Sequence, residues 1–314
     1  MDGVFDVAII GSGPGGLQSA IYCGSEGLRT VVVERGKIGG QIADTPKLEN
    51  FAGQSAKGVS GPAFTHKMRQ QAESFGVVFV KENVVKLERR VNLVIRGEGE
   101  SVKARSAIIA TGATYVIPQI KGIDDSKVKD MVHIGPFNCM NVYENDGFYE
   151  PFVVVGGGNS AGQCALQLAK FGNVRMIIRH KLSTSLYLSE RLRSNDNVII
   201  QENVEVKSVA EYIWDVRGIK CYLSDGLRID ANSLYICTGN KPNSESFACV
   251  KDEIGFIKTD EKFETSIKGV FALGDVRSGV ARRSVANAIG EASSVTAHVH
   301  NYLQSDKAPR STAD

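Results

Sequence analysis

The sequence contains no Cys-x-x-Cys pair, although six cysteines are spread along its 314 residues. Without paired spacing, these cysteines favour neither a zinc site nor a disulfide scaffold, so we expect no bound metal and mostly buried thiols. A strong charge of one sign is also lacking, because 37 Lys and Arg residues face 35 Asp and Glu residues. That balance gives no support for a nucleic-acid partner.

Long apolar runs are missing as well. No uninterrupted run approaches the roughly 20 residues that a membrane helix needs, and the N-terminal stretch has no charged segment followed by a long apolar core. We therefore predict no membrane partner and a cytoplasmic location. The apolar content of 42% is that of a globular chain whose length allows two domains.

Two glycine-rich segments are present, and each follows an apolar run. At a strand-to-helix turn, such glycines let the backbone approach a pyrophosphate and direct the helix N-H groups at its charge. Two copies predict two bound dinucleotides, which indicates a flavin enzyme supplied by a nicotinamide cofactor. The predicted contacts are Gly11, Ser12, Gly13, Pro14, Gly15 and Gly16 in the first copy, and Gly156, Gly158, Asn159, Ser160 and Ala161 in the second.

Each glycine segment is followed by a helical pattern and a second strand. In the first copy that strand, Thr30–Glu34, ends in an acid 23 positions after Gly11, where a carboxylate accepts hydrogen bonds from ribose hydroxyls. The same count from Gly156 reaches Arg179, which precedes His180 and Lys181. Cations there suit a 2′-phosphate and favour NADPH, with NADH as the alternative. A solvent-exposed basic strand end is the competing interpretation.

The two halves of the chain are similar in plan. A strand pattern at 106–112 ends in Thr111-Gly112, and another at 233–237 is followed by Thr238-Gly239. This duplication predicts an α/β fold with two Rossmann-like, three-layer dinucleotide-binding domains, the second inserted in the first. The predicted FAD-binding domain comprises residues 1–116 and 246–314 and ends in a long helix. The predicted NAD(P)H-binding domain comprises residues 117–245.

Taken together, several segments resemble the low-molecular-weight thioredoxin reductase family. They are the two glycine segments, Ile38-Gly-Gly-Gln41, Leu48-Glu-Asn-Phe51, Ala110-Thr-Gly112, Thr238-Gly239 with Pro242-Asn243, and the stretch 270–276. The resemblance spans nearly the whole chain and implies FAD, NADPH and a homodimer. It implies that Asp275 binds the ribityl chain. The other residues it implies at the cofactors are Arg35, Gly40, Gln41, Asn50, Val84, Thr111, Gly112, Gly239, Gly274, Arg283, Ser284 and Val285.

One segment departs from this family. Its disulfide reductases carry Cys-x-x-Cys shortly before the second glycine segment, because one thiolate attacks and the other resolves. Two alignments place that pair on Cys139 and Val142, or on Val142 and Asn145, and neither supplies two thiols. Cys139 is therefore the sole catalytic candidate, through a mixed disulfide or sulfenic acid, and a structural role is favoured for it.

These observations predict an FAD-dependent oxidoreductase that takes hydride from NADPH and passes electrons to an acceptor other than thioredoxin. That acceptor is a small molecule or a redox carrier protein. One alternative is a ferredoxin:NADP reductase-like or ferredoxin-linked flavoenzyme, although the chain after Leu303 lacks an aromatic residue to cover the flavin. The other alternative is a non-catalytic flavin-binding sensor or partner protein. The second glycine segment disfavours it, because such a protein would have no use for a second nucleotide.

Overall fold

The structure is a computed structural model that describes residues 3–45, 47–55, 57–135, 151–213, 217–281 and 283–305. Its described residues up to Thr114 and from Lys241 onward form one compact unit, and Tyr115–Asn240 form a second. In sequence, the second unit is thus inserted into the first. Within the described part of the chain, no helix is long and apolar enough to cross a lipid bilayer.

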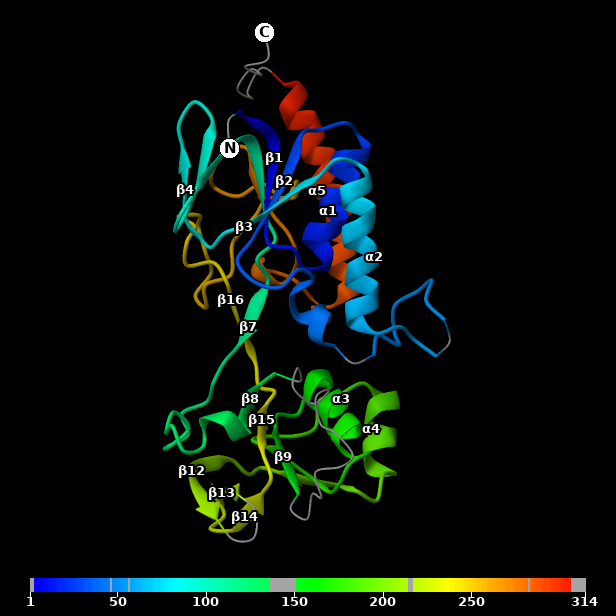
Figure 1. The fold of residues 1–314 in the computed structure, drawn as a ribbon, viewed down its shortest axis with the longest axis vertical. Coiled ribbons are helices and arrows are strands. Elements are labelled where there is room, and N and C mark those ends of the chain that lie inside the picture. Colours follow the sequence, from blue (N-terminus) through cyan, green and yellow to red (C-terminus); the bar gives the residue numbers. More distant parts are fainter. Residues whose placement is uncertain are drawn as a thin grey trace. The chain divides into compact units, whose positions relative to one another are not determined.

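The first unit contains a seven-stranded sheet. Its parallel part comprises β3 (Val78–Lys81), β2 (Thr30–Glu34), β1 (Phe5–Ile10), β6 (Ser101–Ile109) and β17 (Val270–Ala272), in that order. β5 (Leu93–Gly97) and β4 (Val84–Arg89) continue the sheet in antiparallel orientation. Helices α1 (Pro14–Ser25), α2 (Gly61–Ser74) and α5 (Val285–Gln304) lie side by side along it (Figure 1).

The apolar sequence of β1 explains why the sheet is covered on both faces. Val7 and Ile9 pack in a core with residues of α1, α2 and α5. Ala8 and Ile10, which point to the opposite face, pack in a second core with β4 and β5. A continuous apolar strand is typical of such central parallel strands, and the result is a three-layer unit.

The second unit repeats this arrangement. Its parallel sheet comprises β11 (Val198–Glu202), β10 (Val174–Ile178), β9 (Phe152–Val155), β15 (Leu234–Ile236) and β8 (Val132–Ile134), in that order. Helices α3 (Asn159–Leu168) and α4 (Leu186–Arg193) share a core with one face. The other face packs on an antiparallel sheet of β12 (Val206–Ile213), β13 (Arg217–Leu223) and β14 (Arg228–Ala231). The predicted α/β fold with two Rossmann-like units is therefore confirmed.

Short elements complete the chain. The two segments that link the units, β7 (Ala113–Tyr115) and β16 (Asn240–Pro242), pair with each other as a two-stranded sheet. Among the described residues, 3-10 helices span Gly40–Asp44, Lys129–Met131 and Gly274–Val276. α1 begins at Pro14, inside the first glycine segment, because proline fits the first helical position where its missing N-H costs nothing.

Candidate functional site

The carboxyl ends of four parallel strands meet at one edge of the first sheet. Ile10 of β1 pairs with Val33 of β2 and with Ile109 of β6, and Ile109 also pairs with Ala272 of β17. Residues that follow these strands therefore lie at the edge where open α/β sheets bind ligands. Five predicted site residues lie at or just after these strand ends, namely Gly11, Glu34, Thr111, Gly274 and Asp275.

The first glycine turn has two positions that only glycine fits. Gly11 has φ +102°, and a Cβ atom there would lie 2.4 Å from the Ala110 carbonyl oxygen. A Cβ atom on Gly16 would lie 2.1 Å from the Gly11 carbonyl oxygen, so α1 packs closely against the end of β1. These close approaches leave no room for a side chain.

The N-terminus of α1 is open. Its N-cap residue, Gly13, has no side chain to accept a hydrogen bond from the first turn, and a Cβ atom there would meet nothing within 4 Å. By contrast, the hydroxyl groups of Ser60 and Ser284 cap α2 and α5. An N-terminus without a side-chain cap, at the positive end of a helix dipole, suits an anion such as a phosphate.

Glu34 is fixed beside this turn. Its Oε2 atom accepts hydrogen bonds from the backbone N-H of Ser12 at 2.8 Å and from the Ser12 hydroxyl at 2.7 Å. Its Oε1 atom accepts from the backbone N-H of Gly36 at 2.8 Å. The carboxylate is thereby held at the carboxyl end of β2, within reach of a ligand that binds at Gly13.

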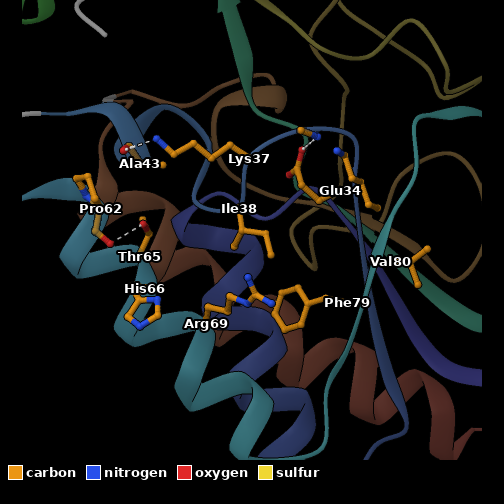
Figure 2. Close-up of a pocket in the computed structure, with 12 residues that line it drawn as sticks. Glu34, Lys37, Ile38, Ala43, Pro62, Thr65, His66, Arg69, Phe79 and Val80 are labelled. Atoms are coloured by element: carbon orange, nitrogen blue, oxygen red, sulfur yellow. Dashed lines mark hydrogen bonds between the residues drawn. The ribbon is translucent and has the colours of Figure 1, made fainter. Parts of the chain in front are cut away.

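A cavity of about 490 Å³ opens beside Glu34 (Figure 2). Its walls come from the loop after β2, from α2 and from β3. The lining combines the Phe79 ring with three cations, Lys37, Arg69 and Lys81, and Arg69 lies over that ring with its Cζ atom 5.5 Å from the centroid. An apolar wall with a few polar groups suits a planar, partly polar group such as a nucleobase. The sequence analysis missed this cavity.

Asp275 lies half-buried in the 3-10 helix Gly274–Val276. Burial raises the pKa of its carboxyl group, and the guanidinium of Arg283 opposes that shift. No described residue donates a hydrogen bond to this carboxylate, so it can accept one from a ligand hydroxyl. Arg283 stacks on Phe256, with its Cζ atom 4.1 Å from the ring centroid.

Other predicted residues lie against the first glycine turn or the linking strands. Gln41 donates from Nε2 to the Ala113 carbonyl oxygen at 2.6 Å, and a Cβ atom on the neighbouring Gly40 would lie 3.2 Å from the Gly13 Cα. Thr111 donates from its hydroxyl to the Asn243 carbonyl oxygen at 2.6 Å. The loop that carries Gly40 and Gln41 is therefore held at the same edge of the sheet.

Four further predicted residues differ in exposure. Arg35 and Asn50 are exposed, whereas the Val84 side chain is buried in the core under β4. The Val285 side chain packs against the core shared by α1, α2 and α5. The Val84 side chain therefore faces the protein interior, whereas that of Val285 is only partly buried.

The second glycine turn repeats the first. Gly156 has φ +135°, and a Cβ atom there would lie 2.1 Å from the Cys237 carbonyl oxygen. Gly158 is the N-cap residue of α3, and a Cβ atom there would meet nothing within 4 Å. A second helix end whose geometry suits an anion therefore lies at the carboxyl end of β9, next to Thr238-Gly239 after β15.

The strand register corrects the position of Arg179. The Gly11 N-H bonds to the Val33 carbonyl, 22 residues later, whereas the Gly156 N-H bonds to the Ile177 carbonyl, 21 residues later. The residue after Val33 is Glu34, and the residue after Ile177 is Ile178. The prediction that Arg179, 23 residues after Gly156, is equivalent to Glu34 was therefore wrong by one residue. The connection from the first glycine of the turn to the end of the next strand is one residue shorter in the second unit. The buried Ile178 stands at the position of the acid, and Arg179 follows it.

A basic segment continues from Ile178. Arg179, His180 and Lys181 are all exposed at the carboxyl end of β10. The Arg179 Nε atom donates to the His180 Nε2 atom at 3.1 Å and lies 4.0 Å from a carboxylate oxygen of Glu205. No acid stands at the position of Ile178, and among the described residues the nearest carboxylate that forms an ion pair with Arg179 is that of Glu205.

The described cysteines are all buried. They are Cys23, Cys164, Cys221, Cys237 and Cys249. Burial raises the pKa of Cys23 and of Cys221 to about 12, so both are protonated thiols near neutral pH and poor nucleophiles. Cys139 lies outside the described residues. Among the described residues, no cluster of His, Cys, Asp and Glu could hold a metal ion.

Comparison with known proteins identifies the family. Residues 5–292 match the model of the pyridine nucleotide-disulphide oxidoreductases. The chain belongs to this family. It is 30% identical over 312 residues to the thioredoxin reductase of Bacillus subtilis, covering 96% of this chain and 95% of that protein. The chain is thus a thioredoxin reductase-like oxidoreductase without the Cys-x-x-Cys pair.

Two further similarities support the assignment. A 34.2 kDa protein in the rubredoxin operon of Clostridium pasteurianum is 34% identical over 304 residues, covering 88% of this chain and 91% of that protein. The crystal structure of Lactococcus lactis thioredoxin reductase matches with a TM-score of 0.86 and 26% identity, covering 95% of this chain and 99% of that one. Both similarities extend over most of the chain.

Proposed function

We propose that this oxidoreductase binds FAD in its first unit and NADPH in its second, and transfers electrons from NADPH to an acceptor other than thioredoxin. The observation that carries the proposal is the pair of glycine-capped helices, α1 and α3, at the carboxyl ends of two parallel sheets. Each offers a positive helix end to one pyrophosphate. NADH is the alternative donor.

Four features of the first unit support FAD. The open N-terminus at Gly13 would hold the pyrophosphate, and Glu34, already fixed by Ser12 and Gly36, would accept the ribose hydroxyls. The cavity beside Glu34 would receive the adenine. Asp275 has a half-buried carboxylate to which no described residue donates a hydrogen bond, and a ribityl hydroxyl would supply one.

The second unit supports NADPH over NADH. Gly158 would hold the pyrophosphate in the same way as Gly13. Ile178 stands where an acid would bind the ribose of NADH, and the exposed Arg179 and Lys181 would bind a 2′-phosphate. The weak contact between Arg179 and Glu205, 4.0 Å apart, leaves this guanidinium available to a ligand.

The chemistry of electron transfer would be supplied by the cofactor. Bound FAD accepts a hydride from a nicotinamide and passes electrons on singly or in pairs. The protein would bind and orient the FAD. Because the chain has no Cys-x-x-Cys pair, it has no dithiol through which to reduce thioredoxin. The relative from a rubredoxin operon makes a small iron carrier protein the first acceptor to test. From the family resemblance we also propose that the protein is a homodimer and that it is cytoplasmic. Light scattering would test the homodimer.

Anaerobic reduction of the purified flavoprotein tests the proposal. We expect NADPH to bleach the flavin absorbance, NADH to do so more slowly, and thioredoxin to remain unreduced when it is added. An acceptor screen with quinones, oxygen, small disulfides and rubredoxin would then identify the acceptor. A flavoprotein that stays oxidised with both nucleotides would contradict hydride entry. Reduction by reduced ferredoxin alone would instead favour the ferredoxin-linked alternative.

A further inference from the structure

Glu291 is a buried carboxylate in the interior of α5, between apolar neighbours. Glu291 is 8% exposed, and its side chain reaches from the helix to the turn that follows β17. The Oε2 atom accepts a hydrogen bond from the backbone N-H of Gly274 at 2.7 Å. The Oε1 atom accepts from Arg277 Nη2 at 2.5 Å and from Asn287 Nδ2 at 3.1 Å. Three donors, one of them a guanidinium, thus converge on this buried carboxylate.

The Gly274 turn is the segment that presents Asp275. Gly274 has φ +70°, so the chain bends sharply between β17 and Asp275. The hydrogen bond from its N-H to Glu291 fixes this bend with respect to α5. Ser284 and Asn287 belong to the first turn of the same helix, where the Ser284 hydroxyl accepts from the Asn287 N-H at 3.2 Å. Glu291 thus joins the two segments on either side of the proposed flavin site.

Arg277 supplies the compensating charge. Its side chain is 18% exposed and its Cζ atom lies 4.8 Å from the centroid of the Phe263 ring. Phe263 has φ +63°, an unfavourable conformation for an aromatic residue that neighbouring structure must hold in place. The ion pair with Glu291 therefore stands in a tightly constrained part of the first unit, next to the Gly274 turn.

The first unit contains a similar ion pair far from this turn. Asp6, in the second residue of β1, accepts from Arg105 Nη1 at 2.8 Å and from the Arg29 N-H at 3.0 Å. Both carboxylates thus accept one guanidinium and one backbone donor. Asp6 lies at the amino end of β1, whereas Gly11 and the proposed cofactor site follow its carboxyl end. The two ion pairs are therefore similar in their donors, and they differ mainly in their distance from the proposed cofactor site.

From these contacts we propose that Glu291 is a positioning residue for FAD. It holds the Gly274-Asp275 turn and the start of α5 in the single arrangement that binds the flavin and its ribityl chain. The inference rests on the proposed function, because it needs FAD in the first unit. It assigns to Glu291 a role that is separate from contact with the cofactor.

The test compares Glu291→Gln with Asp6→Asn in the full-length protein. Glu291→Gln leaves Arg277 without its counter-charge and weakens the bond to Gly274, so we expect the FAD dissociation constant to rise roughly tenfold or more. The visible absorption bands of the bound flavin should shift as well. Both substitutions should lower the unfolding temperature of the FAD-free protein by a similar amount. Asp6→Asn should leave the FAD dissociation constant and the flavin spectrum unchanged.

A double variant covers the case in which Glu291→Gln does not fold. Glu291→Met with Arg277→Met replaces the buried pair by apolar side chains of similar size, a change that proteins often tolerate. The Gly274 N-H still loses its acceptor, so FAD affinity should remain low in a folded protein.

Unchanged FAD affinity and spectrum in either folded Glu291 variant would overturn this inference alone. Equal loss of FAD affinity in Asp6→Asn would also overturn it, because the effect would then be general destabilisation. A wild-type protein that takes up no FAD would overturn the proposed function together with the inference.

Discussion

The two units of this chain share a plan and differ at the end of the strand that follows the glycine-capped helix. Both have five parallel strands, β3-β2-β1-β6-β17 and β11-β10-β9-β15-β8, although β17 is the last of its set in the chain and β8 is the first of its set. In both, a helix without a side-chain cap follows the central strand, β1 or β9, and leads to the second strand of the repeat, β2 or β10. In the first unit the second strand ends in Glu34, fixed by Ser12 and Gly36. In the second it ends in the buried Ile178, followed by an exposed Arg179.

This difference separates what the backbone does from what side chains do. A pyrophosphate is bound by backbone N-H groups and a helix dipole, so both units need the same glycines and the same turn. A ribose is recognised by side chains at the end of the second strand, so that position can differ between the units. The comparison therefore predicts that equivalent substitutions in the two turns will affect different cofactors.

The largest effect is expected when the open helix ends are closed. Gly13→Asp and Gly158→Asp each place a carboxylate where a phosphate would bind, at positions with φ −63° and −91° that any residue adopts. Aspartate is a good N-cap residue, so the fold should be kept. We expect Gly13→Asp to weaken FAD binding at least about a hundredfold, and Gly158→Asp to retain FAD but lose reduction by NADPH.

Fluorescence titration with FAD and stopped-flow reduction measure these two losses. Circular dichroism should show the same helix content in both variants and in the wild type. If Gly158→Asp lost FAD as Gly13→Asp does, the assignment of one cofactor to each unit would be wrong.

The next effect concerns the conformation of the turns. Gly11→Ala and Gly156→Ala each bring a Cβ atom to within 2.4 Å or 2.1 Å of a carbonyl oxygen, so we expect a loss of about 2 to 4 kcal/mol in stability. Gly27→Ala is the matched control, because Gly27 also has a positive φ of +76° but open space around it. Its expected cost is about 1 kcal/mol, measured by chemical unfolding. Equal costs at all three positions would remove the steric argument.

Much of this plan could be predicted from the sequence because it is local. The apolar run before each glycine segment predicts a strand there, and β1 and β9 occupy these two places, since a strand buried on both faces is continuous in apolar residues. The positive φ of Gly11 and Gly156 follows from the same pattern. These features depend on neighbours within a few residues.

The features that the sequence did not predict depend on distant neighbours. The spacing in the sequence aligns Arg179 with Glu34 only if the connection between the first and second strands has the same length in both units. The hydrogen bond between Gly156 and Ile177 shows that this connection is one residue shorter in the second unit. Glu291 is a single acid in an apolar helix, and its partners Gly274 and Arg277 lie a loop away. The cavity beside Glu34 is formed by three segments that meet only in the folded unit.

A smaller effect is expected from the charge of Arg179. Arg179→Glu replaces an exposed guanidinium at the end of β10 by a carboxylate, which would repel a 2′-phosphate. We expect KM for NADPH to rise roughly tenfold while KM for NADH stays the same, since NADH has no such phosphate. Arg228→Glu, in the β14 strand of the same unit, is the control for a general change of charge. An equal rise for both nucleotides would show that Arg179 does not read the phosphate.

The smallest effect comes from the fifth strand of each sheet. In β17 the middle residue is Phe271, whereas in β8 it is His133, which pairs with Tyr235 and has its ring centroid 4.6 Å from that ring. Burial lowers the pKa of His133, and the carboxylate of Asp130 opposes the shift only in part. The second sheet therefore has a titratable group where the first has a ring that does not titrate.

The sign of the resulting pH dependence follows from the lowered pKa. Below about pH 6.5 the unfolded chain takes up a proton at His133 before the folded chain does, so the folded state loses stability as pH falls and levels off below the folded pKa. His133→Phe copies the first sheet and should reduce the drop in unfolding temperature between pH 7.5 and pH 5.5 by roughly 2 °C in calorimetry. An unchanged drop in this variant would assign the acid sensitivity to groups other than His133.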